Sequence, residues 1–453
     1  MAGDINLFRE AMKNSDEMPR IAIIGGTGEF GRLFAKVFKE SGCRVVVTGR
    51  SVVKGERAAQ SIGVEFSNDN VKAAKDADIT IVCVPIESTV EVIEEVAPHI
   101  RPGGLLMDFT SVKVEPVQAM TEHAPEGVEV LGAHPMFGPR VTGLEGQIII
   151  FTPVRGGRWT DFLKGFFKEH RARLFISTPE EHDKVMAVVQ GLTHFAYITT
   201  ASTIRRLGQD VEESRRFASP VYELMLDFIA RIVGQNPLLY AQIQIHNPFV
   251  SEVHETFIRE AEALKSIVAC KDAGGFVKTM TESARIFKDV DSSMGKSDKA
   301  ISALTQELKR LKESVGCEVA LRHIYSGAVH LGRVVSVDPE IVVLECQGKK
   351  TRLKLSNIEL LDDETRLGWK KGHLGVRQMD FSYVFPVDVD EDFLAEFISN
   401  SRGTIVSGRV VDVFRGDQIP VGCKSITLRF ETLESGDADF IKRVLSGLGG
   451  KMR

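Results

Sequence analysis

The sequence predicts an α/β domain with a mostly parallel sheet, followed by a run of helices and then by two small β-containing units. Three observations lead to this prediction. Short apolar strands alternate with amphipathic helices across residues 19–177, as in successive βαβ units. Helical periodicity then continues through residues 178–312, with N-caps expected at Thr178, Ser219, Asn236 and Asn247, each followed by a proline. After about residue 320 the pattern changes to the period-two alternation of half-buried strands.

The bulk composition limits the class of protein. A chain of 453 residues is too long for one hydrophobic core, so several domains are expected. An apolar content of 43% and a charged content of 26% are ordinary for a globular protein, and a net charge of −5 gives no electrostatic footprint for nucleic acid. The six cysteines are scattered, and no apolar run is long enough for a signal peptide or a membrane span. We therefore expect a cytoplasmic protein with reduced cysteines, no bound metal and no membrane partner.

A glycine-rich turn follows the first predicted strand, at residues 20–24, and precedes a predicted helix at residues 32–40. Gly26, Gly28 and Gly31 match the spacing G-x-G-x-x-G. These glycines permit a tight turn, a close approach of the backbone to a pyrophosphate, and close packing of helix against strand. The N-terminus of the helix offers free N–H groups to the phosphates. The sequence therefore predicts a Rossmann-type dinucleotide-binding domain.

Further cofactor contacts are expected from position in this fold. The buried strand at 79–85 should end beside the nicotinamide, because ligands lie outside the carboxyl ends of parallel strands. Together with the glycines and their loop neighbours, this gives the following expected cofactor-binding residues: Gly26, Thr27, Gly28, Phe30, Gly31, Val84 and Pro85. Four more predicted strands continue the sheet: 105–109, 128–131, 147–152 and 173–176.

The end of the second strand bears on the choice of cofactor. NAD-specific domains often place Asp or Glu there to bind the ribose 2′-hydroxyl, whereas this chain reads Thr48-Gly-Arg-Ser51. Arg50 is suited to pair with a 2′-phosphate, and this favours NADP over NAD. Stacking of Arg50 on the adenine, or simple solvation, stays open.

Two motifs each follow a buried strand at the edge where the cofactor is expected. The first is Asp108-Phe-Thr-Ser-Val-Lys113, and the second is Gly132-Ala-His-Pro-Met-Phe-Gly-Pro139. A single loop histidine is more often structural than catalytic. His134 is favoured as catalytic because it comes after a strand that reaches the nicotinamide edge. Ser111 of the first motif is the second catalytic candidate.

These motifs together resemble the signature of prephenate dehydrogenases, enzymes of tyrosine biosynthesis. The resemblance runs from about residue 20 to 250 and continues through Glu181-His-Asp183, Gln190-x-Leu-x-His194-Phe and Ser219-Pro-Val-Tyr222. It implies oxidative decarboxylation of prephenate to 4-hydroxyphenylpyruvate, with hydride transfer to NADP or NAD. It also implies that His134 accepts the proton or hydrogen bond of the substrate hydroxyl, and that Ser111 bonds to His134 or to that hydroxyl.

Arg231 and His194 are the expected substrate-binding residues. Leu224, Phe228 and Arg231 share one helix face, where a guanidinium is costly unless an anion meets it. An ion pair with Asp227 is the alternative. The resemblance implies that Arg231 holds the ring carboxylate and that His194 lines the pocket for the side chain. His182 and Gln190 are further candidates, for which a helix-capping or buried polar role is equally open.

The resemblance implies that residues 178–312 form an all-helical domain that dimerises and closes over the site. Arogenate dehydrogenase, whose substrate has an amine in place of the keto group, is an alternative that the sequence does not separate. An alternative of another class is a non-catalytic dinucleotide-binding regulatory or tRNA-linked protein. The presence together of Ser111, His134 and Arg231 argues against it.

The last third has a different pattern. A small β unit, comparable to an SH3 fold, is expected at 320–365, and a β-α-β-β-α unit at 376–453. The hairpin around Val413-Phe-Arg-Gly416, with Lys424 and Arg429, resembles the ferredoxin-fold anticodon-binding domain of phenylalanyl-tRNA synthetases. Such a ferredoxin-like domain could bind tRNA, bind an amino-acid effector or pair subunits. Its basic residues are too few to argue for nucleic acid as the partner.

Overall fold

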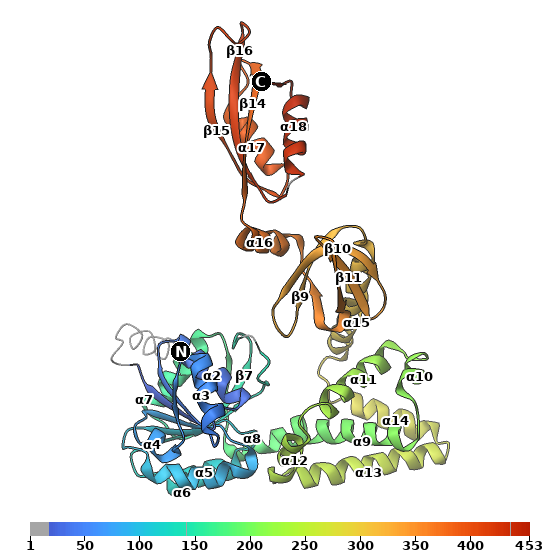
Figure 1. Ribbon diagram of the computed structural model, residues 1–453. Coiled ribbons are helices and arrows are strands. Elements are labelled where there is room, and N and C mark those ends of the chain that lie inside the picture. Colours follow the sequence, from blue (N-terminus) through green and yellow to red (C-terminus); the bar gives the residue numbers. More distant parts are fainter. Residues whose placement is uncertain (1–17, 142, 435) are drawn as a thin grey trace. The chain divides into compact units, whose positions relative to one another are not determined.

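The computed structural model describes residues 18–141, 143–434 and 436–453 (Figure 1). The polar arm expected at residues 1–18 falls, except for its last residue, outside the described residues. Contacts divide the chain into two compact units, Met1–Lys288 and Asp289–Arg453. None of the described helices is long and apolar enough to cross a membrane.

An eight-stranded sheet opens the first unit, in the order β3-β2-β1-β4-β5-β6-β7-β8. Its strands are β1 (Arg20–Ile24), β2 (Arg44–Thr48), β3 (Glu65–Ser67), β4 (Ile79–Val82), β5 (Leu105–Asp108), β6 (Glu129–Pro135), β7 (Ile148–Arg155) and β8 (Arg173–Ile176). The first six are parallel, and β7 runs antiparallel to β6. The strand order reverses between β1 and β4, where such sheets bind ligands. The Rossmann-type fold predicted from the sequence is confirmed.

Helices cover both faces of this sheet (Figure 1). They are α2 (Glu29–Glu40), α3 (Val52–Ile62), α4 (Asn70–Lys75), α5 (Thr89–Val96), α6 (Val114–His123) and α7 (Arg158–Glu169), with short 3-10 turns η2 (Ile86–Ser88) and η3 (Ala97–His99). One face buries an aromatic cluster from α2 and α7, in which the rings of Phe38 and Phe166 are 4.7 Å apart. The other face buries aliphatic side chains of α5 and α6, among them Ile93 and Val117. Each of these buried side chains contributes about 1.5–3 kcal/mol of transfer free energy, so the sheet is a rigid support.

The position of His134 differs from the prediction. The sequence predicted a strand that ends at residue 131 with His134 in the following loop, but β6 continues to Pro135. The reason is β7, whose Ile150 and Ile149 pair with His134 and Pro135 and extend the strand by an antiparallel ladder. His134 is therefore held by the sheet itself.

The helices that complete the first unit begin at α8 (Pro179–Met186). The Thr178 side chain accepts a hydrogen bond from the Glu181 N–H at 3.2 Å, which confirms the predicted N-cap. A π-helical segment, η4 (Ala187–Leu192), leads into α9 (Thr193–Arg206). The remaining helices are α10 (Val211–Arg215), α11 (Pro220–Val233), α12 (Pro237–His246), α13 (Val250–Ala269) and α14 (Ala273–Ala284).

Two of the three Asn-Pro or Ser-Pro caps in this region are confirmed, because Ser219 and Asn236 cap α11 and α12. The expectation that Asn247 caps the next helix is wrong. Asn247 ends α12, and α13 begins three residues later at Val250. Its buried side chain instead accepts from the Phe249 N–H and donates to the Asp183 carbonyl oxygen.

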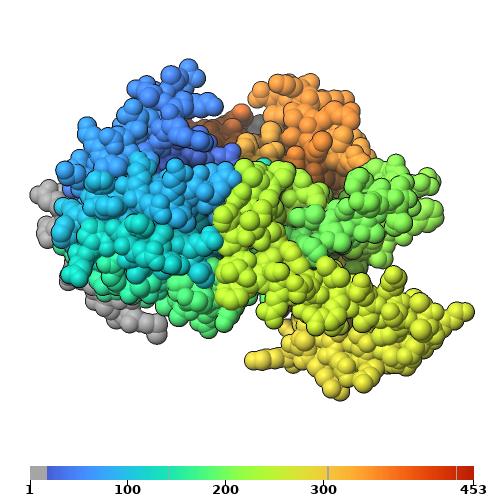
Figure 2. All heavy atoms as spheres, turned by 90° about the horizontal axis from the view of Figure 1, so that it is seen from below, coloured from blue at the N-terminus to red at the C-terminus, as the bar shows by residue number. Residues whose placement is uncertain are grey.

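Helices α9 to α14 leave much apolar surface uncovered. Figure 2 shows the green to yellow part of the chain, which contains these helices, extending away from the blue and cyan part. Their exposed apolar side chains include Leu207, Phe217, Val221, Ile245, Val277 and Met280. Apolar surface of this extent is typical of an interface with another chain.

The second unit contains α15 (Val290–Glu313) and two antiparallel sheets. The first sheet has the order β12-β11-β10-β9-β13, and the buried Leu311 of α15 packs into its core. Its strands are β9 (Glu318–His323), β10 (Val329–Val337), β11 (Ile341–Cys346), β12 (Lys349–Lys354) and β13 (Ile358–Leu360), the last preceded by the 3-10 turn η5 (Leu355–Asn357). The period-two alternation of the sequence predicts strands at 334–338, 341–345 and 351–355, which correspond to β10, β11 and β12, whereas β9 and β13 were not predicted.

The second sheet follows α16 (Asp363–Leu374) and has the order β15-β16-β14-β17. Its elements are β14 (Arg377–Pro386), α17 (Glu391–Asn400), β15 (Ile405–Phe414), β16 (Cys423–Thr432), α18 (Asp437–Gly447) and β17 (Lys451–Met452). The element order β-α-β-β-α-β and this strand order make the unit ferredoxin-like, as expected. The final strand was missed because its two residues carry no periodic signal.

Candidate active site

The glycine loop between β1 and α2 has the shape of a phosphate cradle. A Cβ on Gly31 would lie 2.5 Å from the Gly26 Cα, so neither position leaves room for a side chain. At Gly28, which precedes α2, a Cβ would meet nothing nearer than 3.5 Å, and no side chain caps the helix. The first N–H groups of α2 therefore face open space, and the loop fits a dinucleotide pyrophosphate.

The other predicted cofactor residues surround this loop. The Thr27 N–H donates to the Thr48 carbonyl oxygen at 3.3 Å and ties the loop to the end of β2. Val84 is half-buried beside the loop, and its Cγ1 would lie 2.7 Å from a Cβ on Gly25. Pro85 is exposed at the start of η2. Phe30 packs into an aromatic cluster, with its ring 5.2 Å from that of Phe34.

Arg50 is exposed just beyond the carboxyl end of β2. Within the described part of the chain its guanidinium has no ion-pair partner. No carboxylate stands between Thr48 and Ser51, where a ribose 2′-hydroxyl would need one. The side chain is therefore available for an anion at this edge of the nucleotide site.

A chain of hydrogen bonds runs through the buried histidine of β6. His134 is 2% exposed, and its Nδ1 lies 2.9 Å from the Nε2 of His182 on α8. The Nδ1 of His182 lies 2.7 Å from the Asp183 Oδ1. Burial lowers the pKa of His134 well below its usual value, and the nearby His182 and Lys113 add to this effect. His134 is therefore neutral near pH 7 and has one ring nitrogen free to accept a proton.

Asp183 is held at the N-terminus of α6. Its carboxylate accepts hydrogen bonds from the backbone N–H groups of Lys113 and Val114, at 2.8 and 2.9 Å. A negative charge is stabilised at this end of a helix. Asp183 was not singled out from the sequence as a site residue. The only signal there was its place beside His182 in the first turn of α8.

A buried ion pair lies next to this chain of hydrogen bonds. Lys113 and Asp108 are both fully buried, and the Lys113 Nζ pairs with the Asp108 Oδ2. Burial lowers the pKa of Lys113, while Asp108 and Asp183 oppose the shift. The same Asp108 oxygen accepts the Thr110 N–H at 2.9 Å. The half-buried Ser111 lies in this turn, and among the described residues its side chain makes no hydrogen bond to His134.

Helical residues lie on the Nε2 side of His134. The Gln190 Nε2 lies 3.5 Å from the His134 Nε2, and His194 follows four residues later. Burial lowers the pKa of His194 to about 4, and its ring lies 4.4 Å from that of Tyr240. The Gln190 Oε1 and the His194 Nδ1 are buried without a hydrogen-bond partner in the described structure. Unsatisfied buried polar atoms are costly, so this wall is suited to a polar ligand.

Arg231 lies on the Tyr240 side of this wall. Burial raises the pKa of Tyr240, and the charge of Arg231 opposes that rise, which places the guanidinium close to the phenol. The alternative ion pair with Asp227 is not formed, because Asp227 pairs with Arg215 at 3.0 Å.

The sequence predicted that Arg231 lies on an apolar helix face, where its charge is costly unless an anion meets it. The single chain does not place Arg231 in such surroundings. Arg231 is exposed, and Phe228 on the same face is 48% exposed. The buried side of α11 is the one that carries Leu226 and Ile229. Arg231 is consequently a surface cation that is free to meet an anion.

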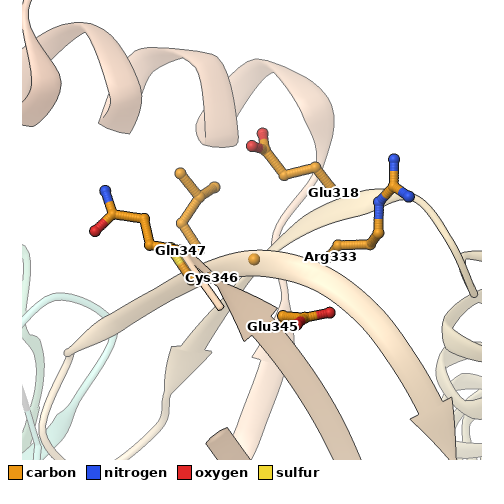
Figure 3. A pocket seen from close by; sticks show the side chains of 7 residues that line it. Glu318, Arg333, Glu345, Cys346 and Gln347 are labelled. Carbon is orange, nitrogen blue, oxygen red and sulfur yellow. The ribbon is translucent and has the colours of Figure 1, made fainter. Parts of the chain in front are cut away.

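A shallow pocket also lies on the first sheet of the second unit. It is lined by Glu318, Leu331, Gly332, Arg333, Glu345, Cys346 and Gln347. Figure 3 shows Arg333 and Glu345 on one side of it and Gln347 on the other. In the strand register Arg333 lies opposite Glu345 of β11 and Glu318 of β9. This pocket contains none of the predicted catalytic groups.

A dinucleotide cradle beside a buried, neutral histidine defines a dehydrogenase of the Rossmann class. The chain matches the family model for the nucleotide-binding domain of prephenate dehydrogenase over residues 34–176. It matches the model for the dimerization domain of prephenate dehydrogenase over residues 178–282.

Relatives and a solved structure agree with these matches. A probable arogenate/prephenate dehydrogenase of Methanocaldococcus jannaschii is 42% identical over 451 residues, which cover 98% of this chain and 100% of that protein. The T-protein of Haemophilus influenzae is 28% identical over 305 residues, covering 67% of this chain and 76% of that protein. Prephenate dehydrogenase from A. aeolicus, solved with hydroxyphenyl propionate and NAD+, shares the fold. Its TM-score is 0.51 at 20% identity, and the match covers 60% of this chain and 99% of that chain.

The chain belongs to the prephenate dehydrogenase family. It is accordingly an oxidoreductase that uses a nicotinamide dinucleotide. The similarity to the M. jannaschii protein extends through the second unit as well as the first, since it covers 98% of the chain.

Proposed function

We propose that this protein oxidises and decarboxylates prephenate to 4-hydroxyphenylpyruvate, with NADP as the preferred cofactor, in tyrosine biosynthesis. The observation that carries the proposal is the neutral, buried His134, whose Nε2 faces a wall with two unsatisfied polar atoms. A hydroxyl group of a substrate that enters this space finds an acceptor at the edge of the nucleotide cradle.

The proposed reaction begins at the C4 hydroxyl of prephenate. A nicotinamide dinucleotide held by the glycine loop would supply the acceptor for the hydride from C4. The His134 Nε2 accepts the hydroxyl proton while the C–O bond becomes a carbonyl. The bond to the ring carboxylate then breaks, and its electrons make the ring aromatic as CO₂ leaves. The oxygen takes the proton back from His134 and becomes the phenol, so no net proton is consumed.

Arg231 is proposed to orient the ring carboxylate, and Gln190 and His194 to contact the other polar groups of the substrate. Ser111 is proposed to bond to the substrate hydroxyl, since the His134 Nδ1 is occupied by His182. We further propose that the chain forms a homodimer through helices α9 to α14, because these helices leave apolar surface uncovered in the single chain.

Replacing Arg231 with alanine should raise KM for prephenate by about 10- to 100-fold, because a hydrogen bond to a charged group contributes about 1.5–3 kcal/mol. KM for the cofactor should not change, since Arg231 lies on the Tyr240 side of the site. Steady-state kinetics measure both constants. Arg216→Ala removes another exposed arginine of the same region and serves as the matched control. A rise in cofactor KM alone would show that the substrate does not reach Arg231.

Arg50→Asp should reverse the cofactor preference. The variant loses a charge-assisted pair with the 2′-phosphate and gains a carboxylate for the ribose hydroxyl, so the ratio of kcat/KM for NADP to that for NAD should fall by about 100-fold or more. Lys36→Asp makes the same charge change on the exposed surface of α2 and should leave the ratio unchanged. An unchanged ratio in Arg50→Asp would remove the 2′-phosphate from this position.

Initial rates of nicotinamide reduction with prephenate and with arogenate, each with NADP and NAD, test the proposed function. We expect prephenate with NADP to give the highest kcat/KM. Turnover of arogenate alone would change the substrate and keep the mechanism. A folded sample that turns over neither substrate with either cofactor would overturn the proposal in favour of a binding protein.

A further inference from the structure

Three side chains lie in line from the N-terminus of α6 to the substrate side of β6. They are Asp183, His182 and His134, and all three are buried. We infer that Asp183 and His182 are positioning residues that select one tautomer of His134, the one whose Nε2 is free to take the substrate proton. This inference rests on the proposed function and deepens it, because it states what keeps the base ready.

Asp183 can only accept hydrogen bonds when it is ionised. Its two oxygens receive the backbone N–H groups of Lys113 and Val114. Its Oδ1 also lies 2.7 Å from the His182 Nδ1, so that nitrogen must carry a hydrogen. A neutral His182 then has no hydrogen on Nε2.

The position of the hydrogen on His182 determines the position of the hydrogen on His134. The bare Nε2 of His182 lies 2.9 Å from the His134 Nδ1, so the hydrogen of that bond must come from His134. A neutral His134 protonated at Nδ1 keeps a lone pair on Nε2. The Gln190 Nε2 lies 3.5 Å from that lone pair, where its amide can donate until a substrate hydroxyl replaces it.

The charges around His134 are consistent with this role. Lys113 faces it from the loop before α6, and Asp108 on β5 pairs with Lys113. Just after β4, burial together with Asp108 raises the pKa of Cys83 to about 12, so that thiol is neutral. Among the charged residues of α8, Asp183 is the buried one, and it contacts His182. With Lys113 and Asp108 paired, Asp183 is the uncompensated charge that stabilises a proton arriving on His134.

A purely structural role for Asp183, as a partner of the α6 backbone, is separable from this one. In Asp183→Asn the amide oxygen can still accept the Val114 N–H, whereas the NH₂ group must turn toward His182. His182 would then accept at Nδ1 and donate from Nε2, and His134 would be protonated at Nε2. The helix contact is kept while the tautomer of the base is reversed, as in the aspartate-to-asparagine change of serine proteases.

The direct experiment is nitrogen NMR of the full-length protein labelled on histidine, without substrate. His134→Asn and His182→Asn variants assign the two rings. The wild-type protein should show hydrogen on Nδ1 of both His134 and His182. Hydrogen on the His134 Nε2 in the wild type would overturn the inference, and this result requires no variant of Asp183 to fold.

Kinetics of Asp183→Asn provide the second arm. The kcat with prephenate should fall by about 100-fold or more, the range of a lost general base, with KM for NADP unchanged and His134 protonated at Nε2. Glu181→Gln makes the same carboxylate-to-amide change two residues earlier on α8 and should leave rate and tautomer as in the wild type. An Asp183→Asn protein with wild-type kcat and tautomer would contradict the inference. A wild-type protein without turnover would instead contradict the proposed function, and the NMR result would still decide the tautomer.

Discussion

Replacing His134 with asparagine should lower kcat for prephenate by about 100- to 10,000-fold, the range that general acid–base catalysis contributes. Asparagine fits the same space and can still bond to His182, but it cannot take a proton. KM for prephenate and for the cofactor should change little, because Arg231 and the glycine loop are untouched. Steady-state kinetics in which one substrate is varied while the other is saturating measure kcat and both KM values.

His170→Asn is the matched control for this substitution. His170 lies at the end of α7, and its ring contacts Ser41 and the Phe166 carbonyl oxygen rather than the site, so kcat should stay as in the wild type. The pH profile gives a second check. Because the pKa of His134 is lowered below its usual 6.5, the acid limb of wild-type kcat/KM should fall below pH 6.5 and vanish in His134→Asn. An unchanged kcat would remove His134 from the chemistry.

Asp108→Ala should lower the free energy of unfolding by about 3–5 kcal/mol, because it leaves the buried Lys113 without its partner. Both side chains are fully buried, so the ammonium group would stay away from bulk solvent after the carboxylate is removed. Urea denaturation followed by circular dichroism measures the change. The double variant Asp108→Ala/Lys113→Met should recover part of the loss, because the buried ammonium group that lost its partner is then also removed.

The control for Asp108 is Asp161→Ala on α7. Asp161 pairs with Lys164 at 2.8 Å, but both side chains are accessible to solvent, at 43% and 27% of their surface. Exposed pairs contribute about 0–1 kcal/mol, so this variant should unfold nearly as the wild type does. Equal losses of unfolding free energy in Asp108→Ala and Asp161→Ala would show that the buried pair contributes no more to stability than the exposed pair.

The fold of the first unit was predictable because its signals are local. The glycine spacing, the apolar runs and the Thr178 cap each occupy a few consecutive residues, and each corresponds to an element of the structure. The extension of β6 to Pro135 depends on pairing with β7, and the hydrophobic pattern of β6 alone does not contain it. The short β17 likewise exists through its pairing with β14.

The structure brings several of the residues proposed for the site together, but the contacts that connect them could not be predicted from the sequence. The motifs indicated His134, His194 and Arg231, and the structure places each of them around the same wall or beside it. The role of Asp183 depends on backbone N–H groups that lie 70 residues earlier in the chain, at Lys113. No spacing rule reports such a contact. Arg231 was placed on an apolar face by periodicity, yet its exposure depends on how α11 packs.

The most direct test of the central claim is the stoichiometry of the products from prephenate. Purified enzyme, prephenate and NADP should yield 4-hydroxyphenylpyruvate, CO₂ and reduced nucleotide in equimolar amounts, since hydride transfer and loss of the ring carboxylate belong to one turnover. Reduced nucleotide that forms without CO₂ would contradict oxidative decarboxylation. Absence of all three products from a folded sample would contradict the assignment of prephenate as the substrate.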